Sequence, residues 1–318
     1  MFLKREFLDA CTQRTRIVIK LHNIKNNKFR CFCDSKWLLP LGLINFIKLN
    51  FLLKKKHRYK YNLAVVAIVK NEGSYLNEWL NYYMSIGVDH CYIYDNYSSD
   101  NTVEVLKEYS DFVTYKKISG KRRQNDAYND ALNNFKNDCK LMAMIDVDEF
   151  IFCPPDNENV VPCIDSYFAN PEVGGITVNW QIFGSSNFSK RPTGLVTDNF
   201  VYRSKNNFYK NKHIKTICNP RKVVGFVNPH YPIYLPRYKA VNENYNNVVG
   251  AFSREISTNL IRINHYFTKS KEEFLKKRSR GMADNLSFRQ MKDFEKHDKN
   301  DIFDESLRKY NEVHHLKS

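Results

Sequence analysis

From about residue 61 onward, short apolar runs alternate with segments of helical periodicity. Residues 63–69, 90–94 and 141–145 are apolar runs of strand length bounded by polar turns, which predicts buried strands. Residues 75–84 carry apolar side chains at helical spacing, and residues 103–109 form the next predicted helix. Strands alternating with helices predict an α/β fold with a mostly parallel central sheet flanked by helices.

The third apolar run ends at two carboxylates, Asp146 and Asp148, with one residue between them. In extended backbone the side chains at i and i+2 point to the same side, so both carboxylates can face one ligand. Open α/β sheets bind ligands at the carboxyl ends of their strands, and Mg²⁺ or Mn²⁺ prefers oxygen ligands. The pair is therefore a candidate site for a divalent cation shared with a phosphate. Asp-x-Asp also occurs by chance, so a structural or solvated role is the alternative.

Polar residues also follow the first two predicted strands. Asn71 and Glu72 come after the first strand, and Asp95 and Asn96 come after the second. An acidic residue in such a position can accept hydrogen bonds from a ribose or a base. These four residues are candidates for binding a nucleoside. For Asp95 and Asn96 the alternative is an Asx turn, in which the side chain bonds only to nearby backbone.

Several segments, taken in order, resemble the family-2-like and family-92-like glycosyltransferases of the GT-A fold. The resemblance begins in the first predicted strand, continues through the carboxylate pair and covers about residues 61–285. The segments that carry it are Val65–Glu72, Tyr94–Asn101, Arg123–Asn129, Ile145–Phe150, Trp180–Ser186, Arg191–Val196, Asn264–Tyr266 and Lys269–Phe274.

The resemblance implies a GT-A-like domain that binds a nucleoside-diphosphate sugar, with a UDP-sugar as the expected donor. It implies that Mn²⁺ or Mg²⁺ bridges Asp146 and Asp148 to the diphosphate and stabilises the charge of the leaving group. His265 would be a further metal ligand, with a hydrogen-bonded core histidine as the alternative. Gln124 and Asp126 lie in the matching segment before the carboxylate pair and would belong to the donor-binding side of the site.

Inverting sugar transfer also needs a general base beside the acceptor hydroxyl. The sequence offers Glu149, next to the carboxylate pair, and Asp198 and Glu243 in the second half of the chain, and it does not single out one of them. Glu149 is equally suited to a structural role in the turn. Trp180 is a candidate for stacking on a sugar ring, with core packing as the alternative.

Charge is distributed unevenly along the chain. Of the net charge of +16, residues 1–60 carry +12, because they hold 15 Lys and Arg against three acidic residues. Within this segment the apolar residues 37–53 are followed at once by the basic residues 54–58. This order suits a helix lying on an anionic membrane surface, and the alternative is a helix packed on the core. No nucleic-acid-binding module is recognisable, so nucleic acid is not an expected partner.

We therefore expect three parts: a basic, partly amphipathic N-terminal arm (residues 1–60), a glycosyltransferase domain (residues 61–285) and a charged, helical C-terminal extension (residues 286–318). No signal peptide or spanning segment is visible, so the expected location is the cytoplasm, with the arm at the inner face of the membrane. The eight cysteines show no CxxC spacing, which predicts reduced thiols.

The expected function is metal-dependent, inverting transfer of a sugar to a glycan or lipid-linked acceptor, in the synthesis of bacterial lipopolysaccharide, capsule or another surface polysaccharide. A metal-dependent nucleotidyltransferase or phosphotransferase is one alternative, although it would be expected to show a Gly-rich phosphate loop or a second carboxylate cluster. A non-enzymatic, membrane-associated binding protein is another, although it would not need polar residues at successive strand ends.

Overall fold

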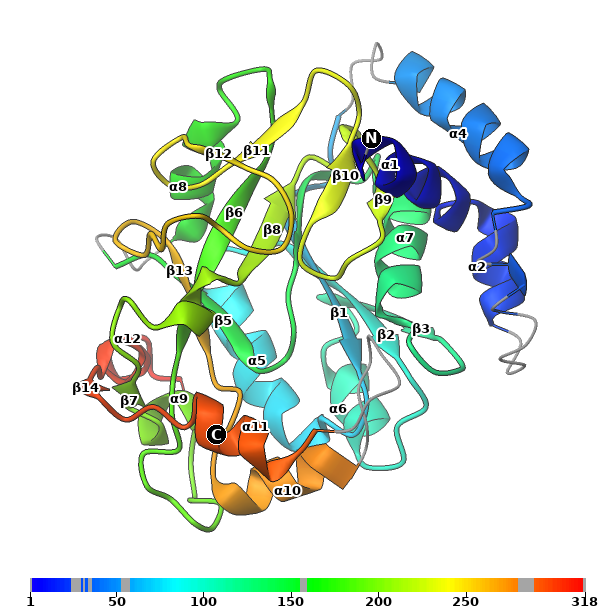
Figure 1. Cartoon of the computed structure of the whole chain (residues 1–318). Helices are drawn as coiled ribbons and strands as arrows, with labels where there is room; N and C mark the ends of the chain where they lie inside the picture. The colour runs from blue at the N-terminus through cyan, green and yellow to red at the C-terminus, as the bar shows by residue number, and fades with distance from the viewer. Residues whose placement is uncertain are drawn as a thin grey trace.

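A computed structural model of the chain describes residues 2–23, 30, 32–33, 36–52, 58–154, 159–279 and 289–316 (Figure 1). The strands and helices predicted from residue 61 to residue 145 are all present. The elements are α1 (Phe2–Gln13), α2 (Arg16–His22), α4 (Leu39–Leu52), β1 (Tyr61–Val69), α5 (Gly73–Ser85), β2 (His90–Asp95), α6 (Thr102–Glu108), β3 (Val113–Lys117), α7 (Gln124–Phe135), β4 (Cys139–Met144), β5 (Glu149–Phe152), α8 (Val160–Tyr167), β6 (Val173–Ile182), α9 (Val196–Asn199), β7 (Tyr202–Arg203), the 3₁₀ helix η1 (Tyr209–Lys212), β8 (Ile214–Cys218), β9 (Val223–Phe226), β10 (Pro232–Tyr234), β11 (Lys239–Val241), β12 (Asn247–Val248), β13 (Arg262–His265), α10 (Lys271–Ser279), α11 (Met291–His297), β14 (Ile302–Phe303) and α12 (Ser306–His314).

The central sheet has the strand order β12-β11-β6-β8-β4-β1-β2-β3, and β13 pairs with both β6 and β5. Strands β4, β1, β2 and β3 are parallel to one another, so their carboxyl ends lie at one edge. Strand β8 runs antiparallel to its neighbours β4 and β6. Five of the nine pairings in this sheet are parallel, and helices flank it, so the predicted α/β fold is confirmed.

Strand β1 lies between two apolar layers, which is why its sequence is apolar without interruption. Successive side chains of a strand point to opposite faces. Val65 and Ala67 pack in the cluster that contains the apolar side of α5, and Ala64 and Val66 pack in the cluster that contains α7. Helices on both faces therefore fix the edge where β1, β2 and β4 end.

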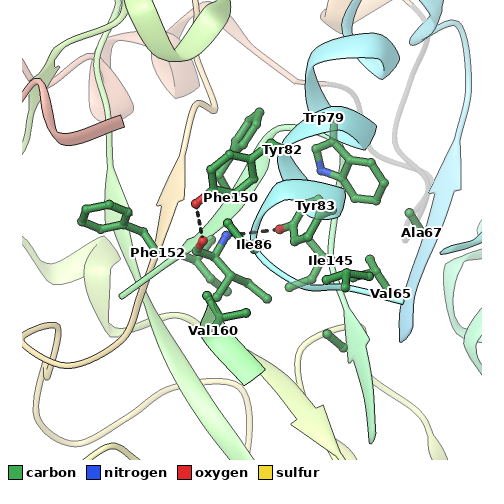
Figure 2. Close-up of a cluster of buried hydrophobic side chains, with 14 of the residues drawn as sticks. Val65, Ala67, Trp79, Tyr82, Tyr83, Ile86, Ile145, Phe150, Phe152 and Val160 are labelled. Carbon is green, nitrogen blue, oxygen red and sulfur yellow. Dashed lines mark hydrogen bonds between the residues drawn. The ribbon is translucent and has the colours of Figure 1, made fainter. Parts of the chain in front are cut away.

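Aromatic residues of α5 support the turn after β4 and the strand β5 that follows it. Figure 2 shows Trp79, Tyr82 and Tyr83 grouped between α5 and the strands. The Trp79 indole N–H donates to the carbonyls of Asp146 (3.2 Å) and Glu149 (3.1 Å), and the Tyr83 hydroxyl also donates to the Glu149 carbonyl (3.0 Å). The ring surfaces fill the core while the polar atoms satisfy buried carbonyls, so α5 fixes the backbone that carries the carboxylate pair.

The described part of the N-terminal arm packs on the body. Helix α1 contacts β9 and β10, α2 contacts α7, and α4 lies outermost against α1 (Figure 1). Arg14, directly after α1, is fully buried, and its guanidinium donates to the carbonyls of Val223, Val224 (3.0 Å) and Leu132 (3.3 Å). Residues 2–23 are thus not a free extension, while the domain boundary at residue 60 stays a prediction.

The C-terminal segment is also joined to the body. Strand β14 pairs with β7, and Asp304 accepts from Arg203 (2.6 Å) and from Arg262 of β13 (2.9 Å). Leu307 and Tyr310 of α12 are buried in the same apolar cluster as Val65 and Trp79. The predicted helices are present in this segment, together with a strand, and they complete the core instead of projecting from it.

Among the described helices, none has the length and apolar character needed to cross a bilayer. Cys11, Cys91, Cys139 and Cys218 are buried free thiols, and Cys31 lies outside the described residues.

Replacing Arg14 by Met should lower the free energy of unfolding by about 3 kcal/mol, because it leaves buried carbonyls of β9 and α7 without a donor. Urea unfolding followed by circular dichroism measures this change. Arg5→Met is the matched control, since Arg5 is exposed on the preceding helix α1, and it should change stability by less than about 0.5 kcal/mol. Equal stability of the two variants would show that α1 does not contribute to folding of the body.

Candidate active site

The carboxylate pair lies in the turn between β4 and β5, at the edge where the parallel strands end. Strand β5 pairs antiparallel with β13, and the register sets His265 opposite Glu149. This pairing explains how a histidine more than a hundred residues downstream comes to lie beside Asp148.

Asp148 is buried against two cationic or ionisable groups. Its Oδ2 lies 3.5 Å from His265 Nε2 and contacts the Lys277 ammonium of α10. Burial alone would raise the pKa of Asp148, but Lys277 and His265 outweigh it and hold the pKa well below its usual value. Burial lowers the pKa of His265 against the pull of Asp148, so its imidazole is neutral at pH 7, the form that binds metals.

Asp146 is held by different partners. Its carboxylate accepts from Lys215 Nζ (2.8 Å) and from Gln124 Nε2 (2.7 Å), and its side chain remains one-third exposed. Lys215, on β8, is fully buried, and its ammonium also lies 3.4 Å from Glu149 Oε2. Burial would lower the pKa of Lys215, but the two carboxylates raise it well above its usual value, so it is charged at neutral pH.

The predicted three-residue metal set is only partly assembled. Within the described residues, no three His, Cys, Asp or Glu side chains converge closely enough to hold a metal ion. Asp148 and His265 form an adjacent pair, whereas the Asp146 carboxylate is turned to Lys215 and Gln124. A pair still fits a hard cation that completes its shell with waters and substrate phosphate oxygens.

The residues predicted to bind the nucleoside tie the strand-end loops together. The Asn71 N–H donates to Ser98 Oγ (2.9 Å), and its side-chain oxygen accepts from the Ser99 N–H (2.8 Å). The Asn96 amide donates to the carbonyls of Ile118 (2.8 Å) and Gly120 (3.0 Å). The loops after β1, β2 and β3 are therefore cross-linked by side chains of the predicted set.

Asp95 and Glu72 take part in the same loops. The Asp95 carboxylate is buried and accepts from the nearby Ser98 N–H (2.9 Å), as in the Asx-turn alternative, and also from the Tyr115 hydroxyl of β3 (3.0 Å). The Glu72 N–H donates to Thr102 Oγ1 (3.2 Å).

Gln124 and Asp126, both in the first turn of α7, bind different parts of the molecule. Gln124 donates to Asp146 Oδ1 (2.7 Å), and its assignment to the donor-binding side stays a prediction. The Asp126 carboxylate is buried and pairs with Arg123, with His22 Nδ1 (2.9 Å) and with Arg30 (2.9 Å). Burial would raise its pKa, but these partners lower it. Asp126 thus binds the N-terminal segment, and its assignment to the donor-binding side stays a prediction.

The three candidate general bases all make structural contacts. Glu149 is fully buried and accepts the Asp146 N–H (2.9 Å), and burial raises its pKa well above the usual value. The Glu243 carboxylate accepts the backbone N–H groups of residues 259–261 and the Ser257 hydroxyl. The Asp198 carboxylate accepts from Asn311 of α12 (2.6 Å). These contacts give each carboxylate a structural role, which sequence alone could not separate from a catalytic one.

Residues that the sequence analysis missed complete the site. Lys277 and Lys215 supply the positive charges at the two aspartates, and the single Lys within the apolar strand Ile214–Cys218 was a signal for the second of these. Trp180 forms a wall beside His265, at 4.2 Å between ring centroids, and stacks on His213 at 4.7 Å. The buried Trp180 indole N–H has no hydrogen-bond acceptor among the described residues.

Lys215→Met should lower the free energy of unfolding by about 3–5 kcal/mol, because it leaves the buried Glu149 carboxyl without its cation. The double variant Lys215→Met, Glu149→Gln should recover much of this loss, since it removes both members of the pair. Urea unfolding of the two single variants and the double variant completes a double-mutant cycle. A double variant no more stable than Lys215→Met would mean that Glu149 is not the energetically important partner.

Comparison with known proteins gives one family. The sequence profile of glycosyltransferase family 92 matches residues 65–313, so the match runs beyond residue 285, the predicted end of the domain, into α12. A family 92 protein of Oryza sativa subsp. japonica is 28% identical over 153 residues, which are 47% of this chain and 26% of that protein. One from Arabidopsis thaliana is 26% identical over 163 residues, 48% of this chain and 28% of that protein. The matched stretch thus spans about a quarter of each relative.

Two solved structures are also similar to parts of the chain. Residues 1–349 of S. aureus TarS superpose with a TM-score of 0.34 at 14% identity, covering 50% of this chain and 47% of that one. Glucosyl-3-phosphoglycerate synthase from Mycobacterium tuberculosis, in complex with Mn²⁺, UDP and glucosyl-3-phosphoglycerate, gives a TM-score of 0.26 at 15% identity, covering 36% and 43%. The profile match extends over more than half of the chain, from β1 through the carboxylate pair to α12, and the chain therefore belongs to glycosyltransferase family 92.

Proposed function

We propose that this protein transfers a sugar from a nucleoside-diphosphate sugar, with a UDP-sugar as the expected donor, to a glycan or lipid-linked acceptor. The observation that carries the proposal is the cluster of Asp148, His265 and Lys277 at the sheet edge, beside Asp146, in a chain of this family. A carboxylate and a neutral imidazole can hold a divalent cation there, and an ammonium lies beside them, so positive charge can be placed on a leaving diphosphate.

The donor's diphosphate is assigned to this cluster and its nucleoside to the loops after β1, β2 and β3. A divalent cation, Mn²⁺ or Mg²⁺, would stabilise the negative charge that develops on the diphosphate, and Asp148 and His265 would hold it. Lys277 contacts the same carboxylate oxygen, so its ammonium is also available to a phosphate oxygen. Asp146, fixed by Gln124 and Lys215, presents a partly exposed carboxylate to the donor.

The acceptor is assigned to the side of the site formed by Trp180 and His213. An aromatic wall next to the reacting centre suits the apolar face of a sugar ring. We include in the proposal the inverting stereochemistry and an acceptor that belongs to a bacterial surface polysaccharide, such as lipopolysaccharide or capsule. An acceptor screen with product linkage read by NMR tests both points.

The central test is Asp148→Asn, which keeps the shape of the side chain and removes its charge. It should lower kcat/KM by at least about a hundredfold, because the carboxylate that would hold the divalent cation at the diphosphate is lost. Release of nucleoside diphosphate from a panel of nucleotide-sugars, with Mn²⁺ or Mg²⁺ and with EDTA, measures the effect. Asp146→Asn should also reduce turnover strongly.

Asp165→Asn is the matched control, since Asp165 forms a surface ion pair with Lys140 (2.7 Å) and should leave turnover unchanged. Full activity of Asp148→Asn would overturn the assignment of the site. Activity that persists in EDTA, with Asp148→Asn still inactive, would overturn the metal alone and keep the transferase.

A further inference from the structure

Helix α4 presents an apolar surface to solvent, which we call the outer face and define as Leu41, Ile44, Ile47 and Phe51. Ile44 is 49% exposed, Ile47 54% and Phe51 70%. The spacing of three to four residues sets these side chains along one side of the helix. Large apolar side chains rarely gather on a surface without a partner.

The orientation of α4 is fixed by its other side. A Cβ added to Gly42 would lie 2.6 Å from the Cys11 carbonyl oxygen of α1, so the two helices approach as closely as glycine allows. Phe46 packs edge-on against Phe7 of α1, with 5.0 Å between ring centroids, and Leu49 is buried. The outer face therefore points away from the body. Figure 1 shows α4 at the outside of the molecule.

Positive charge surrounds this apolar surface. Lys48 is exposed between Ile44 and Phe51 on α4, and Arg58 is exposed beyond the helix. Residues 1–60 carry +12 of the net charge of +16. A second copy of the chain would bring like charges together across a symmetric contact, which is unfavourable. An anionic lipid surface offers both acyl chains for the apolar side chains and phosphates for the lysines.

We propose that the outer face of α4 docks this protein on an anionic bilayer surface. The 14 residues of α4 span about 21 Å along the helix axis, too little to cross a hydrocarbon core of about 30 Å, so the helix lies parallel to the surface. Ile44, Ile47 and Phe51 enter the boundary between headgroups and acyl chains, and Lys48 contacts lipid phosphates. The inference does not depend on sugar transfer, because none of these residues belongs to the candidate active site.

Flotation of the full chain with vesicles tests the proposal. Vesicles of phosphatidylcholine with phosphatidylglycerol should bind it, vesicles of phosphatidylcholine alone should bind much less, and binding should fall as NaCl rises from about 50 to about 500 mM. The triple variant Ile44→Ser, Ile47→Ser, Phe51→Ser should weaken binding by about tenfold or more, because it removes most of the buried apolar area. Lys48→Glu should weaken it as well.

The matched control is Val249→Ser, Leu260→Ser, Val313→Ser, which removes three exposed apolar side chains outside the N-terminal segment. It should bind vesicles like the unaltered chain, and thermal unfolding verifies that both triple variants are folded. Binding that is equal for both triple variants, or equal for both lipid compositions, would overturn the proposal. So would a dimer, measured by light scattering, that the α4 variant abolishes, since the outer face would then contact a second copy.

Discussion

The buried ammonium of Lys215 is the interaction on which the geometry of the site depends. The turn after β4 carries three carboxylates within four residues, and without compensation their charges would repel one another and favour an open loop. Lys215 enters from β8 and lies within ion-pair distance of both Asp146 and Glu149, and Lys277 of α10 pairs with Asp148. The antiparallel strand β8, inserted between β4 and β6, therefore has an electrostatic role as well as a place in the sheet.

The turn is also held by polar groups of aromatic side chains, which the hydrophobic pattern marks only as core residues. The periodicity of α5 predicts a core-facing helix, and its aromatic rings are buried as expected. Their N–H and O–H groups, however, are the donors that hold the turn's carbonyls. Core packing and preorganisation of the carboxylates are thus properties of the same side chains, and a substitution in α5 would affect both.

The local parts of this arrangement could be predicted from sequence, because period, turn residues and strand-end polarity are local properties. Strands β1, β2 and β4, and the position of Asp146 and Asp148 at the sheet edge, belong to this class, whereas β3 (Val113–Lys117) was not predicted. Partners that come from distant segments of the chain cannot be predicted in this way. Nothing near Glu243 in the sequence indicates that its oxygens bind the N–H groups of a loop sixteen residues away, and nothing near Asp126 indicates that it faces His22 and Arg30. A carboxylate's role depends on what covers it, which only the tertiary fold decides.

Helix α7 begins with two residues that bind different parts of the molecule, Gln124 to Asp146 and Asp126 to the N-terminal segment. Its first turn is therefore a rigid link between a carboxylate of the candidate site and residues before the profile match begins. A small change in the tilt of this helix would alter both sets of contacts. Across related sequences, the residues at positions 22 and 30 should consequently covary with those at the start of α7, and through them with the turn between β4 and β5.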